Sequence, residues 1–213
     1  MSRPHVQRLA SMTDTQIKEV ADLCDRAYGG DVCMEALVGG NWSIQNEFIQ
    51  AMTRATLLDG EVFVVQGDGG QIASVAFWFP PGHGLFSKRD QRALGFYDFF
   101  QSLSPEAQSW WQKDYPERMA KMKRDYWSSD EVNRLWWCAN LATDPRAQRQ
   151  GFATALIDAK YQEAALQDEI LGLAAAPEKN VRFYLGAGFR EKGGGEFTSP
   201  TGGSFHLRMF LKE

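Results

Sequence analysis

Cysteine is scarce in this sequence, and no apolar run is long enough for a membrane helix. The 213 residues include three cysteines, Cys24, Cys33 and Cys138, and no C-x-x-C pair. Such a set is typical of free thiols in a reducing compartment, and we expect no metal site. No stretch approaches the ~20 apolar residues of a membrane helix, and MSRPHVQRLASM at the start lacks the apolar core of a signal peptide. We therefore expect a cytoplasmic protein that does not act at a membrane.

An excess of basic residues is also missing. The sequence has 23 Lys and Arg against 27 Asp and Glu, a formal net charge of −4. A nucleic-acid-binding surface needs a basic excess, so we expect no nucleic-acid partner. An acidic chain suits a cationic substrate. The hydrophobic content of 44% is ordinary for a globular protein, and the length suffices for one domain with a large core.

Apolar periodicity predicts two helices and a β-hairpin after a short first strand at 6–9. Thr13 and Gln16 form a capping box before a helical pattern that stops at Gly29-Gly30. A second helix begins near Trp42-Ser43, and a Gly67–Gly70 turn separates strands at 61–65 and 72–79. The apolar loop between the helices contains Tyr28, Met34, Leu37 and Trp42.

Residues 83–131 predict a helical insertion between two strands. Helical patterns cover 88–102, 105–113 and 116–127, and Ser104-Pro105-Glu106 is a favourable helix start. Ten aromatic residues gather here, and we favour the interpretation that they form the insertion's own core. An aromatic substrate pocket or a dimer interface is the alternative. The ten are Phe86, Phe96, Tyr97, Phe99, Phe100, Trp110, Trp111, Tyr115, Tyr126 and Trp127.

The stretch at 135–158 predicts a buried strand, a turn and a helix with an exposed first turn. The apolar run ends at Asp144-Pro145, because proline cannot donate a ladder hydrogen bond. Small residues at Gly151 and Ala153 leave the first helical N–H groups uncovered, and the helix dipole favours an anion there. Arg146 and Arg149 add positive charge. We expect a phosphate or pyrophosphate group to bind at this first helical turn.

The remaining sequence predicts a strand at 169–176, a helix at 180–185 and a last hairpin. Pro177 separates the first two of these elements. Gly193-Gly194-Gly195 and residues 198–203 indicate a flexible hairpin tip before an alternating strand at 204–211. These elements make a mixed α/β domain.

Two motifs in this half resemble the GCN5-related N-acetyltransferase (GNAT) family. The first is Gln148-x-x-Gly151-x-Ala153, and the second is the segment from Asn180 to Phe189, at a fitting separation. The resemblance implies a twisted, mostly antiparallel sheet in which two central parallel strands, 135–143 and 169–176, splay apart. It implies one acetyltransferase domain over 1–213 with the insertion at about 83–131. The similarity is to the branch that acetylates small amines, such as puromycin N-acetyltransferase.

The same resemblance implies acetyl-CoA as the co-substrate and assigns its contacts. Main-chain groups at Leu141, Ala142 and Thr143 are expected to pair with the pantetheine arm as a peptide strand does. Asn180 is expected near the thiol end, and Tyr184 as the general acid, because a phenol can protonate a thiolate at little cost. The residues expected around the pyrophosphate are Gln148, Arg149, Gln150, Gly151, Phe152 and Ala153.

The acceptor side of the site is less defined by sequence. Tyr28, Trp42, Phe79 and His83 are the candidate substrate contacts, although the loop that holds the first two is equally compatible with core packing. The strand from Trp136 to Asn140 carries no carboxylate that could act as the base.

Three routes for deprotonating the amine remain open. His83, His206 or a chain of waters are the candidates, although a lone histidine is more often structural. Cys138 is disfavoured as a nucleophile because no basic residue nearby in sequence would lower its pKa.

The expected activity is transfer of an acetyl group to a primary amine of a small molecule by direct attack, in a monomer or homodimer. Acetylation of a protein or peptide amine is one alternative, although the aromatic insertion argues against an open groove. A CoA-binding regulatory module without turnover is another.

Overall fold

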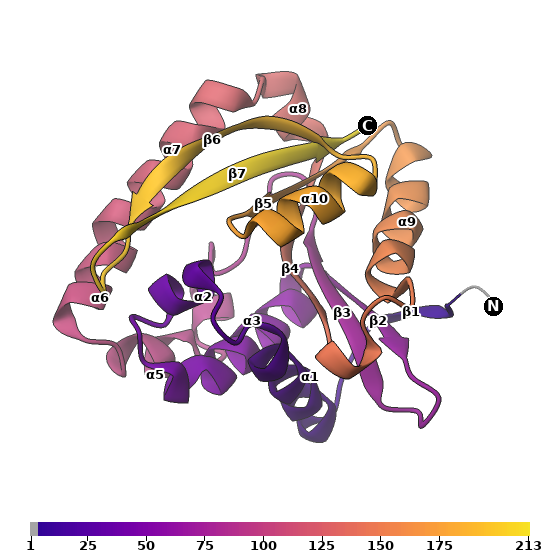
Figure 1. The fold of residues 1–213 in the computed structure, drawn as a ribbon, viewed down its shortest axis with the longest axis horizontal. Coiled ribbons are helices and arrows are strands. Elements are labelled where there is room, and N and C mark those ends of the chain that lie inside the picture. Colours follow the sequence, from indigo (N-terminus) through magenta and orange to yellow (C-terminus); the bar gives the residue numbers. More distant parts are fainter. Residues whose placement is uncertain (1–3) are drawn as a thin grey trace.

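The computed structural model describes residues 4–213, which fold around a seven-stranded sheet with helices on both faces (Figure 1). The strand order is β1-β2-β3-β4-β5-β7-β6, and only the β4–β5 pair is parallel. This confirms the predicted mixed, mostly antiparallel sheet. Residues 1–3 of MSRPHVQRLASM, the segment predicted not to be a signal peptide, lie outside the described residues. The strands are β1 (Val6–Leu9), β2 (Glu61–Gln66), β3 (Ile72–Phe79), β4 (Leu135–Thr143), β5 (Ile170–Ala175), β6 (Arg190–Thr198) and β7 (Ser204–Lys212).

Both faces of the central strands are buried, which explains their continuous apolar sequences. On one face lie α1 (Asp14–Ala27) and α3 (Gln45–Asp59), and on the other lie α9 (Phe152–Ala165) and α10 (Glu178–Gly186). Successive residues of β2 alternate between the two cores, with Val64 packed beside α1 and α3 and Val65 beside α9 and α10.

The predicted N-terminal elements are present, with one helix added. Thr13 caps α1 and forms the predicted capping box with Gln16. The second helix starts as a short 3-10 turn at Trp42–Ile44 and continues as α3. The segment predicted as a loop contains α2 (Val32–Leu37), because the Asp31 carboxylate accepts hydrogen bonds from the N–H groups of Cys33 and Met34.

The insertion between β3 and β4 is helical, as predicted, and reaches Arg134. Its helices are α4 (Arg89–Arg92), α5 (Phe96–Gln101), α6 (Pro105–Ser109), the π-helical η2 (Trp110–Asp114), α7 (Tyr115–Tyr126) and α8 (Ser129–Arg134). The prediction of one helix over 88–102 is wrong. Gly95 interrupts it with φ 118°, and a Cβ there would lie 3.3 Å from the Cβ of Ala51.

Most aromatic side chains of the insertion are packed inside it. The rings of Phe96, Phe99 and Trp111 contact one another, and the ring of Phe48 on α3 lies 4.5 Å from that of Phe99. The Trp111 indole donates to the carbonyl of Leu37 at 2.8 Å. Trp110 donates likewise to Thr198 at 2.7 Å. The aromatic residues therefore pack as core, but that core is shared with α3 and with the sheet and is not the insertion's own. The two indole hydrogen bonds fix the insertion to α2 and to the β6–β7 hairpin.

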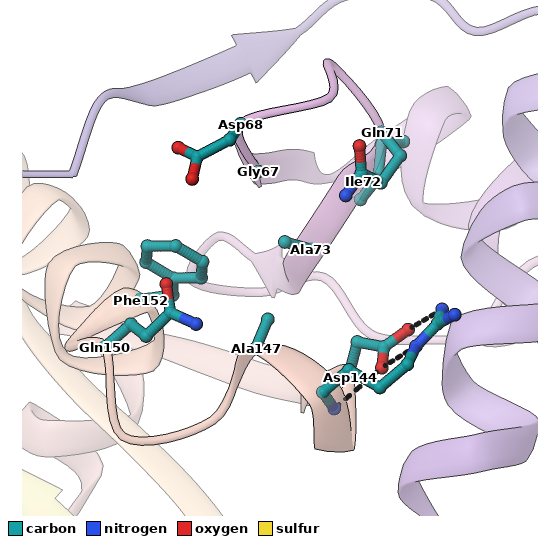
Figure 2. Close-up of a pocket in the computed structure, with 10 residues that line it drawn as sticks. Gly67, Asp68, Gln71, Ile72, Ala73, Asp144, Ala147, Gln150 and Phe152 are labelled. Atoms are coloured by element: carbon teal, nitrogen blue, oxygen red, sulfur yellow. Dashed lines mark hydrogen bonds and ion pairs between the residues drawn. The ribbon is translucent and has the colours of Figure 1, made fainter.

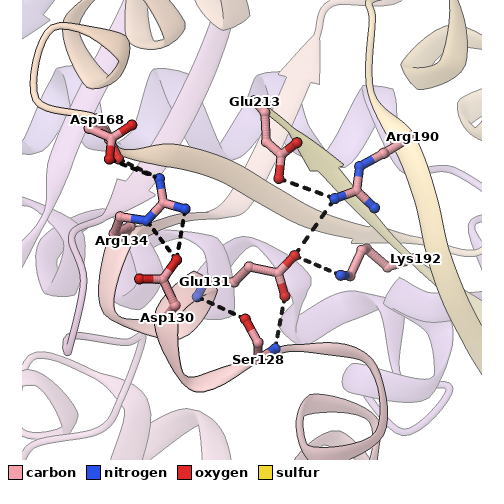
Figure 3. Close-up of polar contacts among 8 residues, drawn as sticks. All are labelled: Ser128, Asp130, Glu131, Arg134, Asp168, Arg190, Lys192 and Glu213. Atoms are coloured by element: carbon pink, nitrogen blue, oxygen red, sulfur yellow. Dashed lines mark hydrogen bonds and ion pairs between the residues drawn. The ribbon is translucent and has the colours of Figure 1, made fainter.

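A second set of contacts fixes α8 to the edge of the sheet (Figure 3). Glu131 receives a hydrogen bond from Lys192 at 2.7 Å and lies 3.7 Å from Arg190, both on β6. Arg190 also pairs with Glu213 at 3.1 Å. β6 is an edge strand, and an uncovered edge can pair with another chain. The ion pairs of α8 and the packing of α7, which runs beside the β6–β7 hairpin in Figure 1, cover one side of this strand.

The prediction of a flexible tip at Gly193-Gly194-Gly195 is wrong. These glycines belong to β6 and pair with β7, and only residues 199–203 form the turn. The Tyr126 hydroxyl donates to the carbonyl of Gly194 at 2.8 Å. A Cβ on Gly193 would lie 2.3 Å from the Tyr126 ring, so the glycines allow α7 to pack closely against the strand.

Candidate functional site

The parallel strands β4 and β5 separate partway along their length. Their pairing ends at Cys138 and Leu173, whereas β4 continues to Thr143. On its other side β4 stays paired with β3, but the register shifts by one residue. Asn140 pairs with Phe77 and Cys138 pairs with the next residue, Trp78, so Ala139 has no partner in β3. Ala139 is therefore the extra residue of a β-bulge, which bends β4 at the point of separation. Within residues 4–213, the backbone groups of residues 139–143 on the β5 side have no strand partner.

A cavity of about 610 Å³ lies at this separation. Its walls come from the end of β4, the loop before α9, the first turn of α9, α10 and the segment after α1. They include nine residues predicted to bind the cofactor, together with Tyr28 and Tyr184. The nine are Leu141, Ala142, Thr143, Gln148, Arg149, Gly151, Phe152, Ala153 and Asn180.

The loop before α9 exposes the start of that helix to the cavity. Gly151 is the N-cap residue at φ 80°, and no side chain caps the first turn. Arg149 also has a left-handed backbone, with φ 62°, an unfavourable conformation that persists only where the surroundings impose it. The N–H groups of the first turn are thus available to an anion, and the exposed Arg149 side chain lines the same space.

Asp144 anchors the beginning of this loop. It is buried and binds Arg26 of α1 at 2.7 Å and Arg146 at 2.7 Å, and these guanidinium groups hold the pKa of its carboxyl well below the usual range. The sequence suggested that Arg146 adds free positive charge to the turn. In the structure Arg146 is paired with Asp144, but Asp144 also pairs with Arg26, so the three groups together keep one net positive charge. Arg149 is the arginine of this loop that has no ion-pair partner among residues 4–213.

A second cavity, of about 380 Å³, lies on the other side of the same loop (Figure 2). It is bounded by the β2–β3 turn at Gly67 and Asp68 and by Gln150, and it shares Ala147 and Phe152 with the larger cavity. Gln150, predicted to contact the cofactor, lines only this second space.

Tyr184 lines the larger cavity from α10. The residue is 8% exposed, and its ring packs against Phe183, Phe189 and Phe210. Its hydroxyl has no hydrogen-bond partner among residues 4–213. Burial raises the pKa of Tyr184, and the nearby Cys138 and Asp31 raise it further, so the phenol stays protonated at neutral pH.

Tyr28 forms the opposite wall, but its hydroxyl is engaged. It donates to the side-chain oxygen of Asn140 at 2.7 Å, and Asn140 is itself buried. Burial raises the pKa of Tyr28 well above its ordinary value. Of the two phenols in the cavity, only Tyr184 has a proton that is not already used in a hydrogen bond within the protein.

Cys138 lies beneath this region as a buried thiol. Burial raises its pKa to about 12. A thiol in this state is almost entirely protonated at neutral pH, and it donates weakly to the carbonyl of Asn140. The structure therefore argues against Cys138 as a nucleophile that would carry the acyl group.

The other predicted acceptor residues lie away from the cavity. Trp42 is exposed on the turn before α3, and Phe79 is fully buried at the end of β3. Nδ1 of His83 lies 3.0 Å from Asp59. His206, considered as a base, lies 3.5 Å from Glu196 on the β6–β7 hairpin. Of the four predicted substrate contacts, only Tyr28 lines the cavity.

Two charged lining residues were not singled out from the sequence. Asp31 follows Gly29-Gly30, and Lys179 directly precedes Asn180. An Asp after two glycines is a typical N-cap pattern, so the start of α2 at Asp31 could have been predicted from the sequence. Nothing in the sequence showed that this helix start lies beside Tyr184.

The comparisons with known proteins agree with this geometry. Residues 118–191 match the family model described as an acetyltransferase (GNAT) domain, and this range contains β4, the loop, α9, β5 and α10. No curated protein matches the chain in sequence.

Solved structures resemble the whole chain. One, from Corynebacterium glutamicum, described as histone acetyltransferase HPA2 and related acetyltransferase, has a TM-score of 0.63 at 16% identity over 99% of this chain and 97% of that one. Arylalkylamine N-acetyltransferase 2 of Aedes aegypti has a TM-score of 0.61 at 16% identity over 98% of both chains. Polyamine N-acetyltransferase of Drosophila melanogaster has 0.60 at 9% identity over 97% of this chain and 99% of that one.

Likeness at such low identity establishes the fold, and the family model adds the acetyltransferase domain. Residues 118–191 therefore match a GNAT acetyltransferase domain, in agreement with the two motifs, and the solved structures show that the whole chain has a similar fold. Enzymes of this type take the acetyl group from acetyl-CoA, which places the chain among the acetyl-CoA-dependent acyltransferases. Within residues 4–213, no helix is both long and apolar enough to cross a membrane.

Proposed function

We propose that the protein transfers the acetyl group of acetyl-CoA to a primary amine of a small molecule by direct attack. One observation carries the proposal. A single cavity brings together an uncapped helix start, the unpaired segment of β4 and a buried tyrosine whose hydroxyl has no partner among residues 4–213. These are the three features that a diphosphate, an amide-bearing arm and a leaving thiolate require.

The cofactor extends along the cavity in this proposal. Its diphosphate binds the first turn of α9 at Gly151, Phe152 and Ala153, with Arg149 supplying positive charge. The pantetheine amides pair with backbone groups of residues 141–143, where β4 lacks a partner on the β5 side. Asn180 hydrogen-bonds the arm near the thiol.

The chemistry requires one new bond and one broken bond. The neutral amine attacks the thioester carbonyl, an N–C bond forms, and the C–S bond breaks. Tyr184 donates its proton to the leaving thiolate, and the proton that the amine loses passes through water to the Tyr184 phenolate, so the net products are the amide and the thiol of CoA and Tyr184 is restored. A backbone N–H at or beside Leu141 is the donor to the developing oxyanion. Burial raises the pKa of Tyr184, which makes it a weaker acid than a free tyrosine, so the proton transfer depends on the thiolate forming in the same buried space, where desolvation also raises the pKa of its thiol.

A small acceptor fits the structure better than a polypeptide. The insertion packs against α2 and β6, which favours an enclosed acceptor site over an open groove. Among the structural neighbours, those from Aedes and Drosophila are named as enzymes of arylalkylamines and polyamines. The insertion also shares its core with α3, so we propose that the chain is one acetyltransferase domain with an insertion. Three points stay predictions: the similarity to the puromycin N-acetyltransferase branch, the cytoplasmic location, and the monomeric or dimeric state.

A thiol-release assay tests the proposal. Purified protein is incubated with acetyl-CoA and a panel of alkyl, arylalkyl, polyamine and aryl amines, and the product mass is measured. We expect CoA release that depends on the amine, with an added acetyl group on the amine. CoA binding without release for any amine would instead favour a regulatory CoA-binding module, and release only with peptides would favour the protein acetyltransferase.

A further inference from the structure

Charges of opposite sign lie on different walls of the large cavity. Its basic residues, Arg149 and Lys179, come from the loop before α9 and from the first turn of α10. Among its lining residues the single carboxylate is Asp31, which comes from the segment between α1 and α2. The basic residues suit the diphosphate of the cofactor, whereas a carboxylate there would repel it.

The Asp31 carboxylate is fixed in place but not compensated. One oxygen accepts the N–H groups of Cys33 and Met34, each at 3.0 Å. The backbone N–H of Asp31 donates to the carbonyl of Tyr28 at 2.8 Å, which holds the segment against the end of α1. The other oxygen has no hydrogen-bond donor, and the carboxylate has no basic partner within 4 Å, among residues 4–213.

Asp31 also lies at the reacting end of the cavity. It follows Tyr28 by three residues, and the Tyr28 hydroxyl is bound to Asn140 beside the β-bulge. Its charge acts on both phenols of the cavity, Tyr28 and Tyr184. The Asp31 carboxylate is half-buried and has no basic partner among residues 4–213. A cationic ligand would offset the free-energy cost of removing this carboxylate from water.

Resting on the function proposed above, we propose that Asp31 binds the ammonium form of the acceptor and makes the enzyme selective for strongly basic amines. The ammonium group lies against the free oxygen of Asp31, close to the Tyr184 hydroxyl. Weakly basic arylamines, which are neutral at pH 7, gain nothing from this contact. Asp31 is thus a specificity residue, and the uncharged fraction of the bound amine is the form that attacks.

The substitution Asp31→Asn tests the role of the charge without removing the helix cap. Asparagine caps helices as well as aspartate does, so its side-chain oxygen can still accept from Cys33 and Met34. The matched control is Asp98→Asn, which removes one negative charge from the exposed side of α5, outside both cavities.

The probes are 2-phenylethylamine, which is protonated at pH 7, and aniline, which is not. In Asp31→Asn we expect the KM for 2-phenylethylamine to rise about tenfold or more, with kcat within about threefold and with the kinetics of aniline unchanged. Calorimetry with CoA-saturated protein should show the same loss of 2-phenylethylamine affinity. Asp98→Asn should match the wild type in every measurement.

Equal losses for both amines, or no loss for either, would overturn the role of Asp31, and so would wild-type protein that binds no ammonium ligand. Calorimetry separates this result from a failure of the proposed function. If acetyl transfer is absent but 2-phenylethylamine still binds in an Asp31-dependent way, the specificity site stands and the transferase proposal fails.

Discussion

The two ends of the large cavity present different kinds of atoms. Around Gly151 the protein offers backbone N–H groups and the exposed charge of Arg149. Around Tyr184 it offers a buried, neutral phenol and the carboxylate of Asp31. The first end suits a charged group that does not change during the reaction, and the second suits atoms that gain or lose a proton. Substitutions at the first end should therefore change cofactor affinity, and those at the second should change turnover or acceptor affinity.

The largest effect should be seen in the reactivity of the buried thiol beneath the reacting end. Burial raises the pKa of Cys138 from 9.0 to about 12, so its thiolate fraction at pH 8 should be lower by a factor on the order of 10³. We expect iodoacetamide to label Cys138 far more slowly in the native protein than in urea. Peptide mass mapping measures both rates, and fast native labelling would reopen a covalent acyl-cysteine route.

The raised pKa of Cys138 also makes the free energy of unfolding depend on pH. The folded protein keeps its thiol proton between pH 9.0 and about 12, whereas the unfolded chain loses it. Because the folded state then binds more protons, its free energy of unfolding should fall as the pH rises through this window. Urea titrations at pH 8 and pH 10 should show the midpoint decreasing at the higher pH.

Tyr184→Phe should have the next largest effect, at the reacting end alone. Phenylalanine retains the packing against Phe183 and Phe210 but cannot protonate the thiolate. We expect kcat to fall by roughly 10²-fold, with the Kd for CoA within about threefold of the wild type. Tyr28→Phe is the matched comparison, and its smaller effect is expected because that hydroxyl already donates to Asn140. Unchanged turnover in Tyr184→Phe would remove the acid role.

Gly151→Glu should act at the opposite end. A carboxylate at the start of α9 would face the diphosphate, and the Kd for CoA should rise by about 100-fold. Gly151→Gln carries a side chain of similar size at the same left-handed backbone position, so it separates charge from strain and bulk. Calorimetric titration of CoA into both variants measures the difference. Equal affinities for the two would mean that no phosphate lies at this helix start.

The smallest expected difference concerns the two arginines of the loop. Arg149→Gln should weaken CoA binding by about fivefold, because an exposed charge contributes about 1 kcal/mol. Arg146→Gln should change it less, because Arg146 is already paired with Asp144. Affinities at low and high salt should converge for the wild type and Arg149→Gln as screening increases. A larger loss in Arg146→Gln would place the diphosphate on the Arg146 side of the loop, beside the second cavity.

Local patterns in the sequence predicted the exposed helix start and most of the residues that line the cavity near it. Gly151, Ala153 and the Asp144-Pro145 stop are consecutive in the chain, so their relation follows from backbone rules alone. Fewer of the residues predicted for the acceptor end line the cavity. Tyr28 was proposed together with Trp42, Phe79 and His83, yet only Tyr28 lines the cavity, and Asp31 was not proposed. Residues of this end come from separate elements, and no local rule states which of their side chains converge.

The sequence by itself determined the alternation of helices and strands, the exposed helix start and the two acetyltransferase motifs, because each depends on residues a few positions apart. Only the tertiary structure decided that Arg146 is paired with Asp144, that Tyr126 packs against the glycines of β6, and that Asp31 shares a cavity with Tyr184. Those outcomes depend on how distant segments pack, since packing sets which charges are compensated and which polar groups face open space.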